Sequence, residues 1–188
     1  MQILVTQFPP KETGLTLIEL VITVTILLTL ISLSVPSFRN MTIKNQQRSE
    51  INSFVHHFHL TRSLAITKET HHILCPSVDG ETCLGTTDWS QGFILFEDRN
   101  RNKTKDQDEL LQGSHHPGEL MAINIHSSSG RKRVVYQGDG RPSGYNLTLT
   151  FCDPDNLIPP KAVIVNNVGR VRVSEVGPSG SPLSCSSR

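Results

Sequence analysis

The feature that most constrains this chain is a long apolar run with a single acid near its start. Residues 14–20 read Gly-Leu-Thr-Leu-Ile-Glu-Leu, and after Glu19 no further charge occurs before Arg39. A carboxylate in hydrocarbon costs a few kcal/mol or more, so an acid in such a run needs a partner or a role. About 20 apolar residues suffice to span a bilayer as a helix. We therefore expect residues 15–36 to form a transmembrane helix in which Glu19 has a function.

The order of segments around this run is the reverse of a secretory signal peptide, which places its cleavage site after the apolar core. Here the polar segment 1–14 comes first and ends in a glycine. This order resembles the class III signal of type IV prepilins, cut by a membrane peptidase after the glycine. The resemblance implies a leader peptide over 1–14, cleavage between Gly14 and Leu15, and methylation at Leu15, where the family usually has Phe. It also implies that Glu19, the fifth mature residue, sets the register between filament subunits. An ordinary signal anchor with a stray acid is the alternative.

The sequence pattern changes twice after the apolar run. Ile51, Phe54, Phe58 and Ala65 recur at helical spacings, which predicts an amphipathic helix over 37–68. On this helix we place His56, His57 and His59 on a solvated face. Short β-like runs follow, bounded by Gly, Pro, Asn and Asp. We predict strands at 71–75, 92–97, 119–126, 132–137, 145–151, 162–166 and 170–174. The expected fold is α+β, a long N-terminal helix packed on antiparallel β-sheets, with a β-rich domain over 69–176 and a Gly/Pro/Ser-rich tail over 177–188.

Four cysteines, Cys75, Cys83, Cys152 and Cys185, all follow the apolar run. An even count in an oxidising compartment favours two disulfides, and four cysteines allow three pairings. The short loop between Cys75 and Cys83 is easy to close, so we prefer that pair together with Cys152 and Cys185, which would hold the tail. Zinc is the rival interpretation, but no C-x₂-C or H-E-x-x-H spacing occurs. We expect no metal and no cofactor.

Motifs along the rest of the chain resemble the FimT/GspH family of minor pilins and pseudopilins. The matching residues are Arg62-Ser63, Ala65-Ile66, Cys75, Cys83, Trp89, Gly92-Phe93, Phe96-Glu97-Asp98, Phe151-Cys152 and Gly169-Arg170-Val171-Arg172. The resemblance implies a type IV pilin-like fold. It also implies a single-pass protein of the bacterial inner membrane with a periplasmic C-terminal domain, later part of an extracellular pilus. Its partners would be prepilin peptidase, the inner membrane before assembly, and other pilins in a filament.

The basic motif at residues 169–172 is the main candidate site. Residues two apart on a strand face the same side, so Arg170 and Arg172 project together at ~6.5 Å, close to the step between phosphates along a DNA strand. Gly169 permits a tight or left-handed turn before the strand. The patch grows if neighbouring strands bring in four further cations, which are Arg131, Lys132, Arg133 and Lys161.

Guanidinium groups bind phosphate in a bidentate manner without reading sequence. In FimT-type proteins that promote natural transformation, a Gly-Arg-x-Arg motif in this position contributes to DNA binding. The resemblance therefore implies sequence-independent DNA binding during uptake. An exposed strand edge protected by charge is the alternative interpretation of the motif. The net charge of +1 supplies no global field for an anionic partner, so any basic site is a local patch.

A second pattern follows the oxygen-ligand spacing of an EF-hand calcium loop, at Asp98, Asn100, Asn102, Thr104, Asp106 and Glu109. Lys103 stands where that loop requires glycine, and its flanks are strands, so we interpret the segment as a polar hairpin loop. Trp89 and Phe93 are assigned to the core rather than to base stacking. No nucleophile motif or cofactor fingerprint occurs, which argues against an enzyme. Two other functions remain as alternatives to DNA binding, a structural pseudopilin of a type II secretion system and a pilus-borne adhesin.

Overall fold

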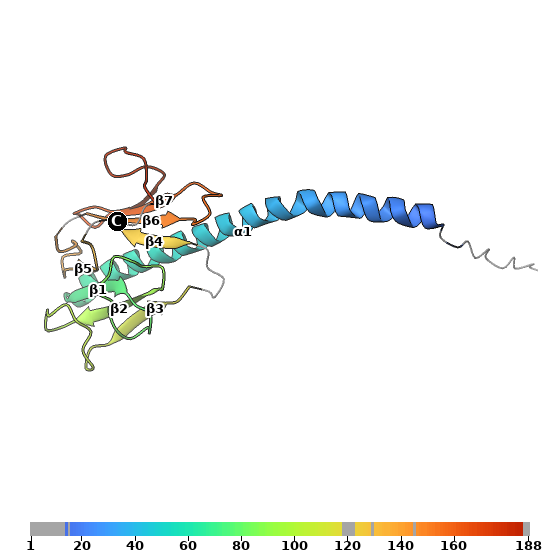
Figure 1. Ribbon diagram of the computed structural model, residues 1–188. Helices are drawn as coiled ribbons and strands as arrows, with labels where there is room; N and C mark the ends of the chain where they lie inside the picture. Colours follow the sequence, from blue (N-terminus) through green and yellow to red (C-terminus); the bar gives the residue numbers. More distant parts are fainter. Residues whose placement is uncertain (1–13, 15, 118–122, 129, 145, 186–188) are drawn as a thin grey trace, which may run out of the picture. The chain divides into compact units, whose positions relative to one another are not determined.

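The computed structural model describes residue 14 and residues 16–117, 123–128, 130–144 and 146–185 (Figure 1). Residues 1–13 of the predicted leader, Leu15, part of the predicted 119–126 strand, Tyr145 and the last three residues of the tail lie outside this part. The chain divides into two compact units, Met1–Arg39 and Asn40–Arg188. One helix, α1 (Leu17–Lys68), contributes to both units.

In the N-terminal unit, α1 begins directly after Thr16. The Thr16 hydroxyl oxygen accepts a hydrogen bond from the Glu19 backbone N–H at 3.3 Å, and its carbonyl accepts from Leu20 N–H at 3.2 Å. Thr-x-x-Glu is the sequence of a capping box, which satisfies backbone donors at a helix start. The apolar side chains from Leu17 to Ile31 are exposed within this unit. Among the described residues, no helix contains a stretch long and apolar enough to cross a membrane.

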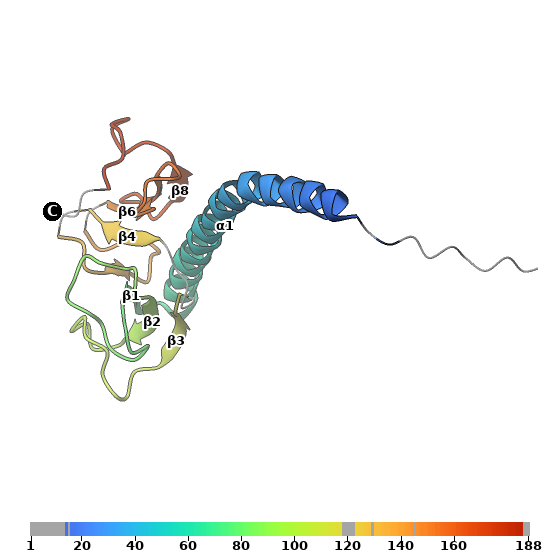
Figure 2. The same cartoon turned by 45° about the vertical axis from the view of Figure 1, so that its right-hand side comes forward.

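In the C-terminal unit, the remainder of α1 packs on two antiparallel four-stranded sheets (Figure 2). The strands are β1 (His71–Pro76), β2 (Phe93–Asp98), β3 (Leu111–His115), β4 (Asn124–Ser127), β5 (Val134–Tyr136), β6 (Leu147–Cys152), β7 (Lys161–Val165) and β8 (Val171–Ser174). Sheet A has the order β3-β2-β1-β5 and sheet B the order β4-β6-β7-β8. This is the predicted α+β architecture.

The core is centred on Phe54 of α1, which is fully buried. Its ring lies 4.5 Å from Phe93 of sheet A, 5.4 Å from Phe151 of sheet B and 6.0 Å from Trp89, measured between ring centroids. Because these partners come from both sheets, one helical side chain joins all three layers. The prediction that Trp89 and Phe93 belong to the core is confirmed.

Two disulfides complete this unit. Cys75 pairs with Cys83, here called the short disulfide, and Cys152 pairs with Cys185, here called the long disulfide. Cys75 and Cys83 belong to a second apolar cluster that also includes Ile73, Ile94 and Phe96. The long disulfide attaches the tail to the end of β6. Both pairings agree with the preferred pairing from the sequence.

Strand β3 was not predicted, and the placement of His57 on a solvated face was wrong. β3 is an edge strand of sheet A and carries Gly113 at its centre. Gly113 lies beside the His57 ring, where a side-chain carbon would be 3.7 Å from the ring, an ordinary van der Waals distance. The His57 ring packs against Phe93 at 4.8 Å, and its Nδ1 donates to the Ser53 carbonyl at 2.8 Å. His57 is therefore part of the contact between α1 and sheet A.

Candidate functional site

The turn that carries the basic motif is held in place from three directions. Gly169 has φ +82°, and a Cβ at this position would lie 2.7 Å from the Gly140 carbonyl oxygen. No other residue type meets both conditions without a shift of the backbone. Arg62 of α1 donates from Nη1 to the Gly169 carbonyl at 3.3 Å, and the Asn166 side-chain oxygen accepts from Arg170 N–H at 2.8 Å. The turn therefore fixes where strand β8 begins.

Arg170, directly before β8, and Arg172, within β8, are both exposed. Val171 between them packs against the core, which turns the two arginines to the opposite face. β8 is an edge strand of sheet B. Neither guanidinium has an ion pair or a hydrogen bond with any residue that the structure describes. The two arginines are thus available to an anionic partner.

The acid nearest to them in sequence is already engaged. Glu175 accepts from Lys161 Nζ across the β7–β8 pair at 3.2 Å. This bridge is exposed on the glutamate side, so its net stabilisation is small. The bridge engages Lys161, and among the described residues neither Arg170 nor Arg172 has an acid partner.

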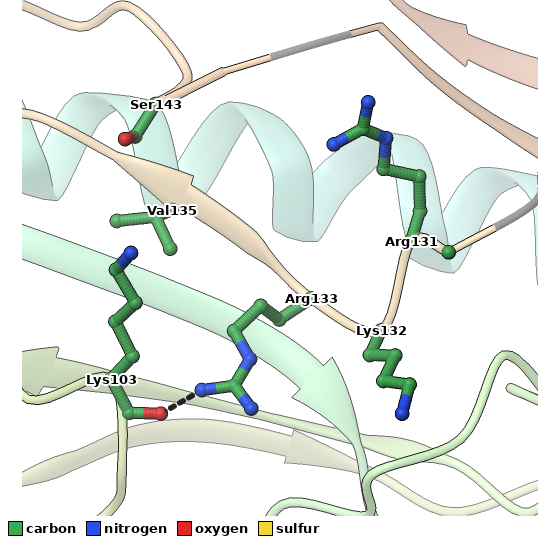
Figure 3. A pocket seen from close by; sticks show the side chains of 7 residues that line it. Lys103, Arg131, Lys132, Arg133, Val135 and Ser143 are labelled. Atoms are coloured by element: carbon green, nitrogen blue, oxygen red, sulfur yellow. Dashed lines mark hydrogen bonds between the residues drawn. The ribbon is translucent and has the colours of Figure 1, made fainter.

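A second basic group surrounds a hollow of about 270 Å³ (Figure 3). It is lined by Lys103, Gly130, Arg131, Lys132, Arg133, Val135 and Ser143. Arg133 donates from Nη1 to the Lys103 carbonyl oxygen. Figure 3 shows the cationic side chains spreading in different directions rather than converging on one point. The hollow is therefore basic but does not form a single cradle for one phosphate.

The predicted basic residues fall into separate places. β4, which precedes Arg131, and β8 are the two opposite edges of sheet B. Three strand spacings separate such edges, roughly 14 Å. Lys161 lies on β7, next to β8, but is paired with Glu175. The structure thus brings together Arg170 with Arg172, and Arg131–Arg133 with Lys103, as two distinct basic surfaces.

The sequence analysis missed the buried polar support behind the turn. Tyr136 of β5 is fully buried, and a Cβ on Gly169 would lie 3.1 Å from its ring. Burial raises the pKa of Tyr136 to about 12, while the charge of nearby Arg62 acts in the opposite direction. The phenol stays neutral at physiological pH and serves as packing for the turn. The sequence analysis quoted Arg62 in the Arg62-Ser63 motif, but nothing in the sequence connected Arg62 with Gly169, 107 residues away.

At the other end of the chain, Gly14 is exposed, whereas Leu15 lies outside the described residues. The Glu19 side chain is exposed, and its carboxylate has no partner among the residues that the structure describes. An acid on an exposed apolar helix is available to a neighbouring molecule.

Comparison with known proteins identifies a family and three similar solved structures. A family model described as type II transport protein GspH matches residues 50–175. The structure is similar to the type IV minor pilin FimU of Pseudomonas aeruginosa strain PAO1, with a TM-score of 0.56 and 14% identity, covering 76% of this chain and 97% of that one. A second crystal form of FimU gives a TM-score of 0.52, 14% identity and coverage of 74% and 98%. The minor pseudopilin EpsH from the type 2 secretion system of Vibrio cholerae gives a TM-score of 0.48 and 14% identity, covering 69% of this chain and 96% of that one. A search of curated proteins finds no match. At this identity, the likeness to FimU concerns the fold.

Proposed function

This chain belongs to the GspH family of minor pilins and pseudopilins, and we propose that it is a minor type IV pilin that binds DNA through the phosphate backbone during uptake. One observation carries the proposal. Arg170 and Arg172 are exposed on an edge strand and have no acid partner within the described chain, while the neighbouring Glu175 is paired with Lys161. Two free guanidinium groups on one face of a strand suit two successive phosphates.

The physics of such a site defines its behaviour. Two arginines neutralise about two phosphates, so the slope of log affinity against log salt is about −1.8 on duplex DNA and about −1.4 on single strands. Affinity per subunit is weak and independent of sequence, because contacts from arginine to phosphate carry no information about the bases. Several copies in one filament raise the overall hold through effective concentration.

The N-terminal segment supplies the rest of the proposed function. Prepilin peptidase cuts after Gly14, residues 15–36 hold the protein in the inner membrane, and Glu19 directs its addition to a filament of other pilins. The free carboxylate of Glu19 on an exposed apolar helix supports this assignment. An acid in that setting gains most from a positively charged partner such as the α-amino group of another subunit.

The test is a DNA titration of the full chain in detergent micelles. Labelled duplex DNA is titrated at two salt concentrations with the wild type, with Arg170→Gln/Arg172→Gln, and with Lys44→Gln/Arg48→Gln. The last variant removes the same charge from two exposed positions of α1. We expect weak binding that fades with salt, is lost in the first variant and is retained in the second. Equal loss in both variants would show that only total charge matters and would refute the proposed site.

A structural role in a type II secretion system is the second candidate, and the description of the matched family favours it. It predicts that the wild type binds no DNA although its domain is folded. Trp89 is the single tryptophan of the chain and is fully buried, so its emission reports whether the domain is intact. Absence of binding with native Trp89 emission would favour this second candidate.

A further inference from the structure

The connection between β2 and β3 has one backbone feature of a calcium loop, although it lacks the glycine that normally provides it. Six oxygen-bearing residues occupy the first, third, fifth, seventh, ninth and twelfth places of this loop, namely Asp98, Asn100, Asn102, Thr104, Asp106 and Glu109. The sixth place of a calcium loop of this spacing requires a sharp turn, normally made by glycine. Lys103 at this place has φ 64°, and Arg101 has φ 62°. Lys103 therefore makes the left-handed turn that the spacing requires.

Asp98 provides an independent indication that the loop binds something. Its side chain is almost completely buried, with 1% of the residue exposed. Its Oδ2 accepts a hydrogen bond from Lys103 N–H at 3.2 Å, which places the carboxylate inside the loop. Its Oδ1 is buried and has no hydrogen-bond partner among the described residues. Burying a carboxylate oxygen without a hydrogen-bond donor or a cation costs free energy, and a cation bound at Asp98 Oδ1 would remove that cost.

The other polar side chains of the loop are hydrogen-bonded within it, and the Asn100 and Asn102 side-chain oxygens accept from the backbone N–H groups of Asn102 and Thr104. Asp106 Oδ2 accepts from Asn100 Nδ2 and from Asn102 Nδ2, each at 2.7 Å. Glu109, with 4% of the residue exposed, accepts from Arg99 N–H at 2.9 Å and from Asp106 N–H at 3.1 Å. Two amide groups on one carboxylate oxygen supply the partial positive charge that a bound cation would supply in full.

We propose that the loop from Asp98 to Glu109 binds a calcium ion. Calcium takes six to eight oxygen ligands in flexible geometry, whereas magnesium demands a near-ideal octahedron. Asp98, Asp106 and Glu109 supply the charge, and the Asn100 and Asn102 side-chain oxygens complete the side-chain ligands. In the described residues no three His, Cys, Asp or Glu side chains gather closely enough to hold a metal. Binding therefore requires the Asn100 and Asn102 amide nitrogens to release Asp106. It also requires their oxygens, which accept from backbone N–H groups at 3.0 Å and 2.7 Å, to face the ion.

The cations of the loop set the strength of this site. Arg101 and Lys103 are exposed at places that carry no ligand, and Lys105 donates from Nζ to the Asp106 carbonyl at 2.8 Å. The positive charges of these side chains repel the calcium ion and weaken its binding. We expect a dissociation constant of about 10⁻⁴ to 10⁻³ M, the range of extracellular calcium modules. The site is separate from Arg170 and Arg172, so it stands whether or not the protein binds DNA.

The test is calorimetric titration of the full chain in detergent micelles, freed of divalent ions by a chelator. Wild type, Asp106→Asn and Asp98→Asn are titrated with calcium chloride and with magnesium chloride. The matched control is Asp108→Asn, which removes one exposed acid of the same loop from the eleventh place, where no ligand is expected. We expect one calcium site in the wild type and in the control, and an affinity about tenfold or more weaker in each ligand variant.

Two results would overturn the proposal. The first is no calcium binding by the wild type at about 10 mM, well above the expected range. The second is binding that survives unchanged in both ligand variants, or that magnesium reproduces equally. Asp98 is buried and its replacement can perturb folding, whereas Asp106 is half-exposed and is expected to leave the fold intact. Native Trp89 emission in Asp106→Asn keeps the comparison valid.

Discussion

Replacement of Gly169 by alanine tests whether the glycine of the basic motif is there for the fold rather than for contact with a ligand. The new Cβ would stand 2.7 Å from the Gly140 carbonyl oxygen and 3.1 Å from the Tyr136 ring, at φ +82°. Both neighbours belong to the packed interior, and the closer one is backbone. Relief therefore requires one turn to move away from the other, which also moves the first arginine of the motif.

The expected loss of stability in Gly169→Ala has two parts, which comparison with a variant at a second glycine separates. A left-handed conformation costs an L-residue about 1–2 kcal/mol. Pressing an additional carbon into a packed site adds about 1–3 kcal/mol. Gly130 has φ +78° with no atom within 4 Å of a new Cβ, so Gly130→Ala carries only the first cost. We expect Gly169→Ala to destabilise the folded protein by about 3 kcal/mol and Gly130→Ala by about 1 kcal/mol.

The assay is urea unfolding of the full chain in detergent micelles, followed by the emission of the single, fully buried Trp89. The free energy of unfolding is compared among wild type and the two alanine variants. A weaker affinity of Gly169→Ala for DNA, with both arginines present, would accompany the loss of stability. If Gly169→Ala is no less stable than Gly130→Ala, the contact between the two turns is not rigid and the argument fails.

Three further predictions use the same unfolding assay. The paired cysteines are separated by 8 residues in the short disulfide and by 33 in the long one, so loop-closure entropy gives stabilisations of about 2.5 and about 3.7 kcal/mol. Replacing both cysteines of the long disulfide by alanine should therefore lower the free energy of unfolding more than the same change in the short disulfide. The reverse order would contradict this account. Burial is the main cause that lowers the pKa of His57 and of His72 below the usual value, so the unfolded state binds more protons. The free energy of unfolding should therefore fall as the pH drops below about 6.5, and His57→Gln should lessen that fall. A pH dependence that is unchanged in His57→Gln would refute this cause. Phe54→Ala should cost about 4 kcal/mol because its ring joins the helix to both sheets, and a loss below about 2 kcal/mol would show that the core closes around the gap.

Local pattern was sufficient to predict most elements of the fold. The helical spacing of Phe54 and Phe58, and the alternation from Leu147 to Phe151, each have a period that belongs to one type of structure. β3 has no such pattern, because its sequence is Leu-Gln-Gly-Ser-His and its pairing depends on β2 beside it. Gly113 of this strand lies beside His57, which is more than fifty residues earlier in the chain, and no local pattern predicts that contact.

The candidate site could be predicted only in part, because some of its features have a local sequence pattern and others depend on contacts between distant residues. An apolar Val171 between Arg170 and Arg172 indicates that both arginines face outward, and the structure has them exposed. The bridge between Lys161 and Glu175 depends on the register of β7 with β8, and the hydrogen bond from Arg62 to the turn spans 107 residues. Neither contact has a local signal, so whether a basic residue is free or engaged could not be decided from the sequence.

The separations of the paired cysteines affect how the protein reaches its oxidised form. In the proposed topology, the domain after the membrane helix would cross from its N-terminal end, and Cys75 and Cys83 would emerge together before either cysteine of the long disulfide. The short disulfide can therefore close while no competing thiol is present, which leaves the two later cysteines only each other. Cys185 follows every strand of sheet B, so in this topology the last oxidation would come after that sheet has been translocated. The order in which the cysteines would emerge thus favours the observed pairing among the three possible ones.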